Sequence, residues 1–166
     1  MSTAIHLKDI TKRFPGGVLA NDDIDLAVEH GSVHALLGEN GAGKTTLMNV
    51  LYGLYEPTAG TVHIEGEPVE FDTPQDAIER GVGMIHQHFT LVDPMTVLEN
   101  IALGWEPVKY GGVSVDDGAV AADIRELSER YNVGVADDID TPVEQLSVGQ
   151  QQRVEILKTL YRGADF

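Results

Sequence analysis

One glycine-rich stretch, VHALLGENGAGKTTLMNVL, restricts the possible folds of this chain more than any other feature. It contains Gly38, Gly43, Lys44 and Thr45 in the spacing G-x-x-x-x-G-K-[ST], after an apolar run typical of a strand and before a run typical of a helix. Glycine lets such a loop curl with its N–H groups turned inward toward an anion. A chance glycine turn before a helix is the alternative, but strand, loop and helix occur in the required order. The stretch predicts an α/β fold with a nucleoside triphosphate site.

The residues of this loop have distinct expected roles. A helix beginning near Lys44 presents unpaired N–H groups and the positive end of its dipole to an anion. That end contributes only about 0.3 to 2 kcal/mol, too little to hold a triphosphate on an acidic protein. Lys44 is therefore expected to reach the β- and γ-phosphates, and the Thr45 hydroxyl to ligate Mg²⁺. The predicted phosphate cradle consists of Gly38, Glu39, Asn40, Gly41, Ala42, Gly43, Lys44, Thr45 and Thr46.

Acidic residues outnumber basic ones, 27 to 11, and give the chain a formal net charge of −16. This charge opposes nonspecific binding to nucleic acid or to anionic membrane surfaces. The scattered carboxylates favour a solvated surface over a metal site. A further hypothesis is a very salty, halophilic cytoplasm, because the Debye length falls to about 3 Å at 1 M salt. The carboxylates in question are Asp22, Asp23, Asp25, Glu65, Glu67, Glu70, Asp137, Asp138 and Asp140.

The 166 residues suffice for one domain or for part of a larger one, and the absence of cysteine excludes a disulfide framework. The N-terminus lacks the features of a signal peptide, and no run of about 18 apolar residues occurs. The sequence therefore predicts a cytoplasmic, soluble chain.

Short apolar runs and capping residues predict the secondary structure. The runs AIHL, IDLAV, VHALL (33–37), TVHI and VGMIH (82–86) are typical of strands. Helical spacing predicts one apolar face made by Leu47, Val50, Leu51 and Leu54, and another made by Val120, Ile124, Leu127 and Tyr131. Two shorter helices are indicated by Thr73 with Pro74 and a stop at Gly81, and by a capping box of Thr96 with Glu99 ending at Gly104.

A second polar stretch, LSVGQQQR, begins at Leu146. Ser147 and Gln150 form another capping box, so a helix is predicted from Ser147. Its inner face would carry Val154, Leu157 and Tyr161, with Gln151 and Gln152 partly exposed. Taken alone, this pattern favours a polar helix without a ligand. Its combination with the glycine-rich loop favours a nucleotide-site role.

Three motifs now stand in a fixed order: GENGAGKTT, MIHQHFTLV and LSVGQQQRVEIL. They resemble the Walker A loop, the Q-loop and the signature motif of the nucleotide-binding subunits of ATP-binding cassette (ABC) transporters. The resemblance runs from about Ile5 to the last residue. It implies a P-loop NTPase (RecA-like) core with an antiparallel β subdomain and a helical subdomain, incomplete at the C-terminus. Residues 1–92 would form the β subdomain and P-loop core, and residues 93–166 the helical subdomain.

The resemblance also implies the roles of individual residues in binding ATP and Mg²⁺. Phe14 matches the aromatic that stacks on adenine, although a core aromatic beside a turn is the alternative. Gln87 matches the glutamine that contacts Mg²⁺ and the attacking water, although its position also suits a polar strand end. Ser147, Gly149 and Gln150 match the group that binds the γ-phosphate of ATP held by an opposite cassette. Lys44, Gln87 and Ser147 are the implied catalytic residues.

The motifs look most like those of importers for simple sugars and nucleosides. This implies a second cassette arranged head to tail, which can lie in the same polypeptide, transmembrane permease subunits, and indirectly an extracytoplasmic solute-binding protein. It also implies a cytoplasmic location, peripheral on the inner face of the membrane, and no nucleic-acid partner.

One family feature is missing, the Walker B strand with its Asp-Glu pair. The candidate TLVD ends at Asp93 and is followed by Pro94 rather than Glu. His86 and His88 lie in the Q-loop and do not supply the missing general base. The chain is therefore expected to bind nucleotide but not to hydrolyse it alone, and to expose an apolar edge along residues 33–37 that makes it poorly soluble or partly unfolded.

Two other functions remain as alternatives. One is a cassette ATPase that works on DNA or ribosomes, which is disfavoured by the negative charge and by a spacing of roughly one hundred residues between Gly38 and Ser147, too short for a coiled-coil insertion. The other is a regulatory ATP-binding module without turnover, which a comparison of turnover with ATP affinity would distinguish.

Overall fold

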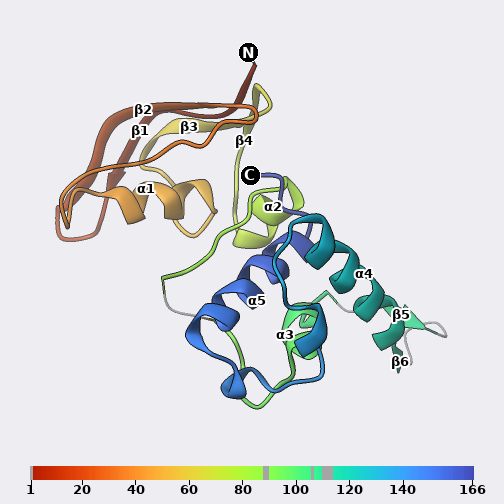
Figure 1. Ribbon diagram of the computed structural model, residues 1–166. Coiled ribbons are helices and arrows are strands. Elements are labelled where there is room, and N and C mark those ends of the chain that lie inside the picture. The colour runs from red at the N-terminus through yellow and green to blue at the C-terminus, as the bar shows by residue number, and fades with distance from the viewer. Residues whose placement is uncertain (1, 88–89, 106, 110–113) are drawn as a thin grey trace. The chain divides into compact units, whose positions relative to one another are not determined.

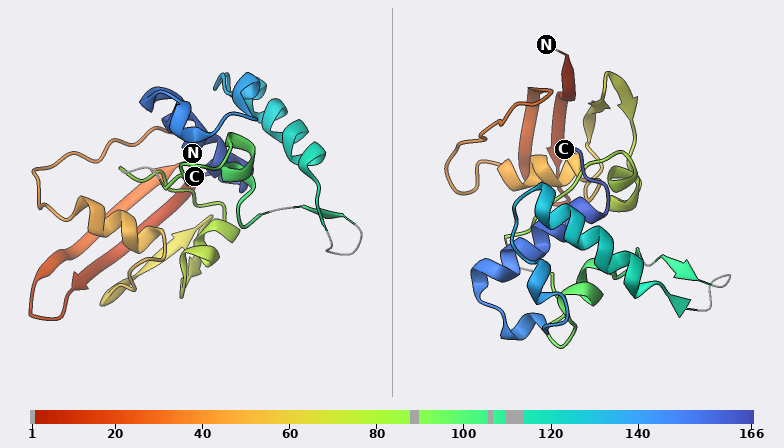
Figure 2. Two further views of the ribbon diagram at one scale, coloured as in Figure 1. Left: turned by 90° about the horizontal axis from the view of Figure 1, so that it is seen from below. Right: turned by 45° about the vertical axis from the view of Figure 1, so that its right-hand side comes forward.

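The computed structural model describes residues 2–87, 90–105, 107–109 and 114–166. The chain divides into two compact units, Met1–Val82 and Gly83–Phe166. Figures 1 and 2 show the elements of both units, and each unit is described by itself. Within the described part of the chain, every helix is too short or too polar to span a lipid bilayer.

The first unit contains a four-stranded antiparallel sheet in the order β2-β1-β3-β4. Leu7 at the centre of β1 pairs with Leu26 on one side and Val62 on the other, and its side chain is fully buried. The strands predicted from AIHL, IDLAV and TVHI are confirmed as parts of β1, β2 and β3. The bounds are β1 Thr3–Arg13, β2 Leu19–Glu29, β3 Ala59–Ile64 and β4 Glu67–Val69.

Helix α1 (Lys44–Leu51) runs along one face of this sheet in Figure 1 and buries Leu47 and Val50. The helix ends about a turn earlier than predicted, because Gly53 follows with a left-handed φ of 74° that an α-helix cannot accommodate. Leu54, predicted on the buried face, therefore lies beyond the helix and is 44% exposed.

Residues 33–37 and 82–86, both predicted as strands, are not strands in the structure. An apolar run becomes a strand only when a neighbouring strand bonds its backbone groups, and no strand among the described residues pairs with either segment. Several of their apolar side chains are exposed, Val33 by 101%, Leu37 by 89% and Ile85 by 45%, whereas Val82 is buried with an exposed fraction of 4%. Residues 33–37 are thus exposed as an irregular segment, and not as the edge of a sheet that the sequence predicted.

The short helix α2 (Pro74–Glu79) has Thr73 as N-cap and Pro74 at its first position, as predicted. The Asp76 carboxylate accepts hydrogen bonds from the Thr73 N–H at 2.8 Å and the Thr73 hydroxyl at 3.0 Å. These bonds favour the ionised form and lower the pKa of Asp76. The first turn of α2 is thus fixed locally, just before the chain reaches Gly81.

The second unit packs three helices around one apolar core, with Ile101, Ile124, Val154 and Leu157 fully buried. The predicted capping boxes at Thr96 and Ser147 are both confirmed. Tyr131 was predicted to face the core, but α4 ends before it and its side chain is 48% exposed. The elements are α3 Val97–Ala102, β5 Val108–Lys109, β6 Ser114–Val115, α4 Asp117–Arg130 and α5 Val148–Tyr161.

Candidate nucleotide site

The glycine-rich loop of the first unit leads into α1. The N-terminus of this helix has no side-chain cap. Gly41 and Gly43 have φ of 86° and 83°, in the left-handed region where glycine is strongly favoured. Gly43 is the N-cap of α1, no side chain bonds the first-turn N–H groups, and no acidic residue lies in that turn. These N–H groups have no intrahelical partner, so the loop presents them to an anion.

The Lys44 side chain folds back and contacts the start of its own loop. Its Nζ donates to the carbonyl oxygens of Gly38 at 2.7 Å and Glu39 at 2.8 Å. A phosphate can replace these neutral acceptors and gain a charge-assisted hydrogen bond. The remaining cradle residues are accessible: Gly38, Glu39, Asn40, Gly41, Ala42 and Thr45 are exposed, and Gly43 and Thr46 are half-buried.

A residue that the sequence did not reveal, Asn21, holds the end of this loop. Asn21 is only 5% exposed, and its Nδ2 donates to the Gly43 carbonyl at 3.2 Å. A Cβ at Gly43 would lie 2.2 Å from the Ala20 carbonyl oxygen, so β2 packs directly against the loop. The LANDD stretch has the composition of a solvated turn, and its local pattern contains no signal that Asn21 is buried.

Phe14 follows β1 in the hairpin turn, where its N–H donates to the Val18 carbonyl at 2.9 Å. Its ring meets the Tyr55 ring edge-on, with centroids 5.3 Å apart and an interplanar angle of 87°. Lys12 Nζ lies 5.4 Å from the Phe14 centroid. Phe14 is half-buried rather than enclosed in the core, so part of the ring is accessible to a ligand.

In the second unit, the signature residues lie at the first turn of α5. The Ser147 hydroxyl donates to Gln150 Oε1 at 2.7 Å, and the Gln150 N–H donates back to Ser147 Oγ at 3.4 Å. Gln150 Nε2 also donates to the Asp138 carboxylate at 3.1 Å. Gly149 is exposed, and a Cβ there would meet nothing within 4 Å. The side-chain hydrogen bonds of Ser147 and Gln150 are therefore made within the unit, while Gly149 is exposed to solvent.

The Q-loop is described in part. Gln87 is exposed at a bend and His86 is half-buried, whereas His88 lies outside the described residues. Gln87 belongs to the same unit as the signature residues, and the glycine-rich loop belongs to the other.

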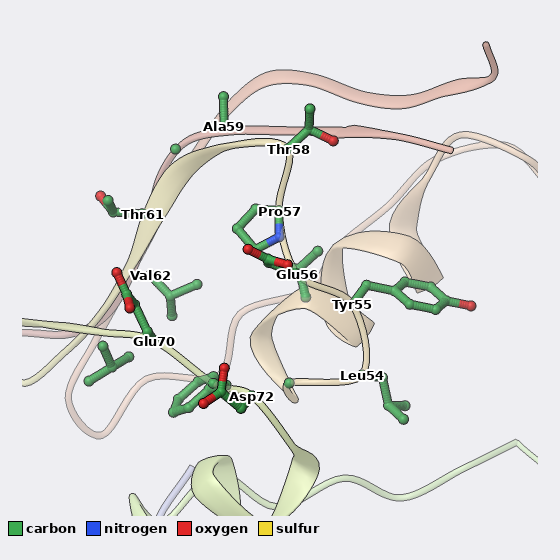
Figure 3. Close-up of a pocket in the computed structure, with 15 residues that line it drawn as sticks. Leu54, Tyr55, Glu56, Pro57, Thr58, Ala59, Thr61, Val62, Glu70 and Asp72 are labelled. Carbon is green, nitrogen blue, oxygen red and sulfur yellow. The ribbon is translucent and has the colours of Figure 1, made fainter. Parts of the chain in front are cut away.

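A pocket of about 310 Å³ lies between the end of α1 and strands β3 and β4 (Figure 3). None of the predicted nucleotide-site residues lines it. The carboxylates of Glu56, Glu70 and Asp72 line it instead, and their negative charge would repel a triphosphate. The pocket is therefore not the nucleotide site.

Comparison with known proteins decides the family. The family model described as "ABC transporter" matches residues 21–166. The chain belongs to the ABC transporter family. The predicted resemblance is therefore confirmed. The predicted fold class is confirmed by a solved structure, the ADP conformation of MJ1267, an ATP-binding cassette of an ABC transporter. It matches at a TM-score of 0.83 and 26% sequence identity, and the match covers 99% of this chain and 66% of that one.

Import ATP-binding proteins are among the relatives of this ABC chain. The nucleoside import ATP-binding protein NupA of Lactococcus lactis is 55% identical over 98% of the chain, and the glucose import ATP-binding protein TsgD13 of Haloferax volcanii is 44% identical over 97%. The chain spans 31% and 34% of the lengths of these two relatives.

Proposed function

We propose that this chain is the Mg-ATP-binding part of an importer that couples ATP hydrolysis to uptake of a nucleoside or a sugar. The observation that carries the proposal is the uncapped start of α1, with the Lys44 ammonium held beside it by two neutral carbonyls. The names of the NupA and TsgD13 relatives support the choice of an importer and of these two solute classes.

The proposed roles are those that the resemblance to the family implies. Residues 38–46 would hold the phosphates, Phe14 would stack on adenine, and Thr45 and Gln87 would ligate Mg²⁺. The first turn of α5 would contact the γ-phosphate of ATP bound to a second, head-to-tail cassette. We also propose that residues 1–92 form the β subdomain and P-loop core and that residues 93–166 form the helical subdomain.

The proposed chemistry rests on positioning and charge. The N–H groups of the loop and the Lys44 ammonium would neutralise charge on the phosphate oxygens. Magnesium, when held by Thr45 and Gln87, would supply further neutralisation of the phosphate charge. Uptake would then require permease subunits and a solute-binding protein, with the ATPase on the cytoplasmic face of the membrane and no nucleic acid involved.

Replacing Gly149 by alanine tests the head-to-tail arrangement. The chain itself leaves open space for the new Cβ, and alanine favours a helix by about 0.5 to 1 kcal/mol over glycine. We therefore expect unchanged or higher thermal stability and unchanged ATP affinity. ATP-driven pairing, measured by light scattering, should fall at least about tenfold because the Cβ blocks the approach of a partner's phosphate.

Gly118→Ala is the matched control, since Gly118 is also helical and its nearest neighbour would lie 3.5 Å from a new Cβ. It should leave pairing unchanged. Equal pairing in wild type, Gly118→Ala and Gly149→Ala would contradict the head-to-tail proposal.

The proposal of a salty cytoplasm predicts stabilisation by KCl. Eight of the nine carboxylates singled out in the sequence are exposed, and Asp138 is half-buried. Raising KCl from about 0.1 M to about 2 M screens their repulsion, because the Debye length falls below 3 Å. Thermal denaturation should shift upward by about 5 °C or more, equivalent to roughly 2 kcal/mol for a chain of this size.

The double variant Asp22→Asn/Asp23→Asn separates charge screening from a general salt effect. It removes two adjacent exposed charges. We expect it to raise the melting temperature in dilute salt and to reduce the gain from KCl. A melting temperature that stays constant or falls with KCl would contradict the halophilic hypothesis.

A further inference from the structure

Two charged side chains of α5 are buried, although neither belongs to the proposed nucleotide site. Glu155 is 3% exposed and Lys158 is 7% exposed. Removing an ionised group from water costs several kcal/mol unless hydrogen bonds replace the lost hydration. Both side chains direct their hydrogen bonds to one residue, Thr90, which stands three positions after Gln87.

The contacts with Thr90 involve all of its polar groups. Glu155 Oε1 accepts from the Thr90 N–H at 2.7 Å and from the Thr90 hydroxyl at 3.0 Å. Lys158 Nζ donates to the Thr90 carbonyl at 3.3 Å. Thr90 is itself exposed, so water could have satisfied these groups. Core packing therefore does not require this arrangement.

The next residues are held in the same way by α3. Asn100 is fully buried, its Oδ1 accepts from the Val92 N–H at 2.7 Å, and its Nδ2 donates to the Val92 carbonyl at 3.1 Å. The last residues of the Q-loop motif, Thr90 and Val92, are thus hydrogen-bonded through their backbone groups, Thr90 to α5 and Val92 to α3.

We infer that Glu155 and Lys158 are positioning residues, which fix the exit of the Q-loop to the signature helix through the backbone of Thr90. The inference deepens the proposed function and rests on it for the roles of Gln87 and Ser147. Helix α5 is continuous from Val148 to Tyr161, and Ser147 and Glu155 are separated by about 12 Å of helix. A movement at either motif is therefore transmitted to the other as a displacement of one rigid element.

The chemistry of the pair supports a positioning role. Replacing a buried ion pair by apolar residues of similar size is often neutral or stabilising. The stability of the fold alone therefore does not explain two buried charges on α5. Burial lowers the pKa of Lys158, the Glu155 carboxylate raises it, and Arg162 lowers it. Burial thus disfavours the Lys158 ammonium, and the nearby Glu155 carboxylate offsets part of this effect.

Hydrogen exchange in the full-length, nucleotide-free protein tests the inference. Glu155→Ala and Lys158→Met should each raise the exchange rate of peptides covering residues 84–95 by about tenfold or more, because local opening at Thr90 becomes easier. Glu155→Gln keeps an acceptor oxygen and should retain most of the protection. At saturating ATP, Glu155→Ala should also weaken ATP-driven pairing about tenfold while the ATP affinity of the single chain changes less than about twofold.

Gln151→Ala is the matched control, since Gln151 lies on the same helix and donates to the carbonyls of Val143 and Leu146 instead. It should leave exchange at 84–95 unchanged. Wild-type exchange in Glu155→Ala, or an equal rise in Gln151→Ala, would overturn the inference. The exchange measurement needs no nucleotide, so a protein that fails to bind ATP would overturn the proposed function and leave this result intact.

Discussion

Lys44→Ala is expected to abolish measurable ATP binding while leaving the fold intact. In the nucleotide-free protein the ammonium bonds only carbonyl groups of its own loop among the contacts described, Gly38 and Glu39. Losing two charge-assisted hydrogen bonds to phosphate costs roughly 3 to 6 kcal/mol, or about a hundredfold to ten-thousandfold in affinity. Isothermal titration with Mg-ATP measures the loss, and circular dichroism verifies the fold. Lys44→Met, which keeps most of the apolar stem, should behave in the same way.

Ser147→Ala provides the contrast. It removes the N-cap hydrogen bonds to Gln150 and should cost about 1 kcal/mol of stability in the second unit. Because Ser147 is proposed to contact ATP held by another cassette, the affinity of a single chain should persist and only ATP-driven pairing should weaken. Equal losses of affinity in Lys44→Ala and Ser147→Ala would refute the arrangement in which two chains share each ATP.

Helix starts could be predicted because they are determined by neighbouring residues. The N-caps at Thr73, Thr96 and Ser147 depend on hydrogen bonds within three or four positions, and all three were confirmed. The segments 33–37 and 82–86 were wrongly predicted as strands. Either segment could become a strand only by pairing with a strand distant in sequence, and an apolar run does not reveal such a partner. Capping patterns thus located helix starts correctly, whereas apolar runs located the strands β1, β2 and β3 but misplaced two others.

The missed residues share a different property, which is that they are polar and buried. Asn21 holds Gly43 across 22 positions, and Glu155 holds Thr90 across 65. Sequence patterns assign polar residues to the surface, because most of them lie there. A weak signal existed for α5, where Glu155 and Lys158 directly follow the buried Val154 and Leu157. No comparable signal marked Asn21.

Gly43→Ala should destabilise the first unit more than any other single change in the loop. Alanine at a φ of 83° costs about 1 to 2 kcal/mol, because its Cβ approaches the following carbonyl. The same Cβ would lie 2.2 Å from the Ala20 carbonyl oxygen, which is backbone and cannot rotate away. Loop and strand must therefore separate, at a total cost of roughly 3 kcal/mol or more. Urea unfolding followed by circular dichroism measures this cost.

Gly41→Ala isolates the steric part of the effect. Gly41 has a similar φ of 86°, but a Cβ there would meet nothing within 4 Å, so only the backbone strain applies. Asn21→Ala added to Gly43→Ala should not restore stability, because the limiting contact is with the Ala20 backbone rather than with Asn21 Nδ2 at 2.8 Å. Equal destabilisation by Gly41→Ala and Gly43→Ala, or recovery in the double variant, would show that β2 does not fix the end of the phosphate loop. The loss at Gly43 should extend to ATP affinity, since the N–H groups at the start of α1 keep their direction only while Gly43 lies against β2.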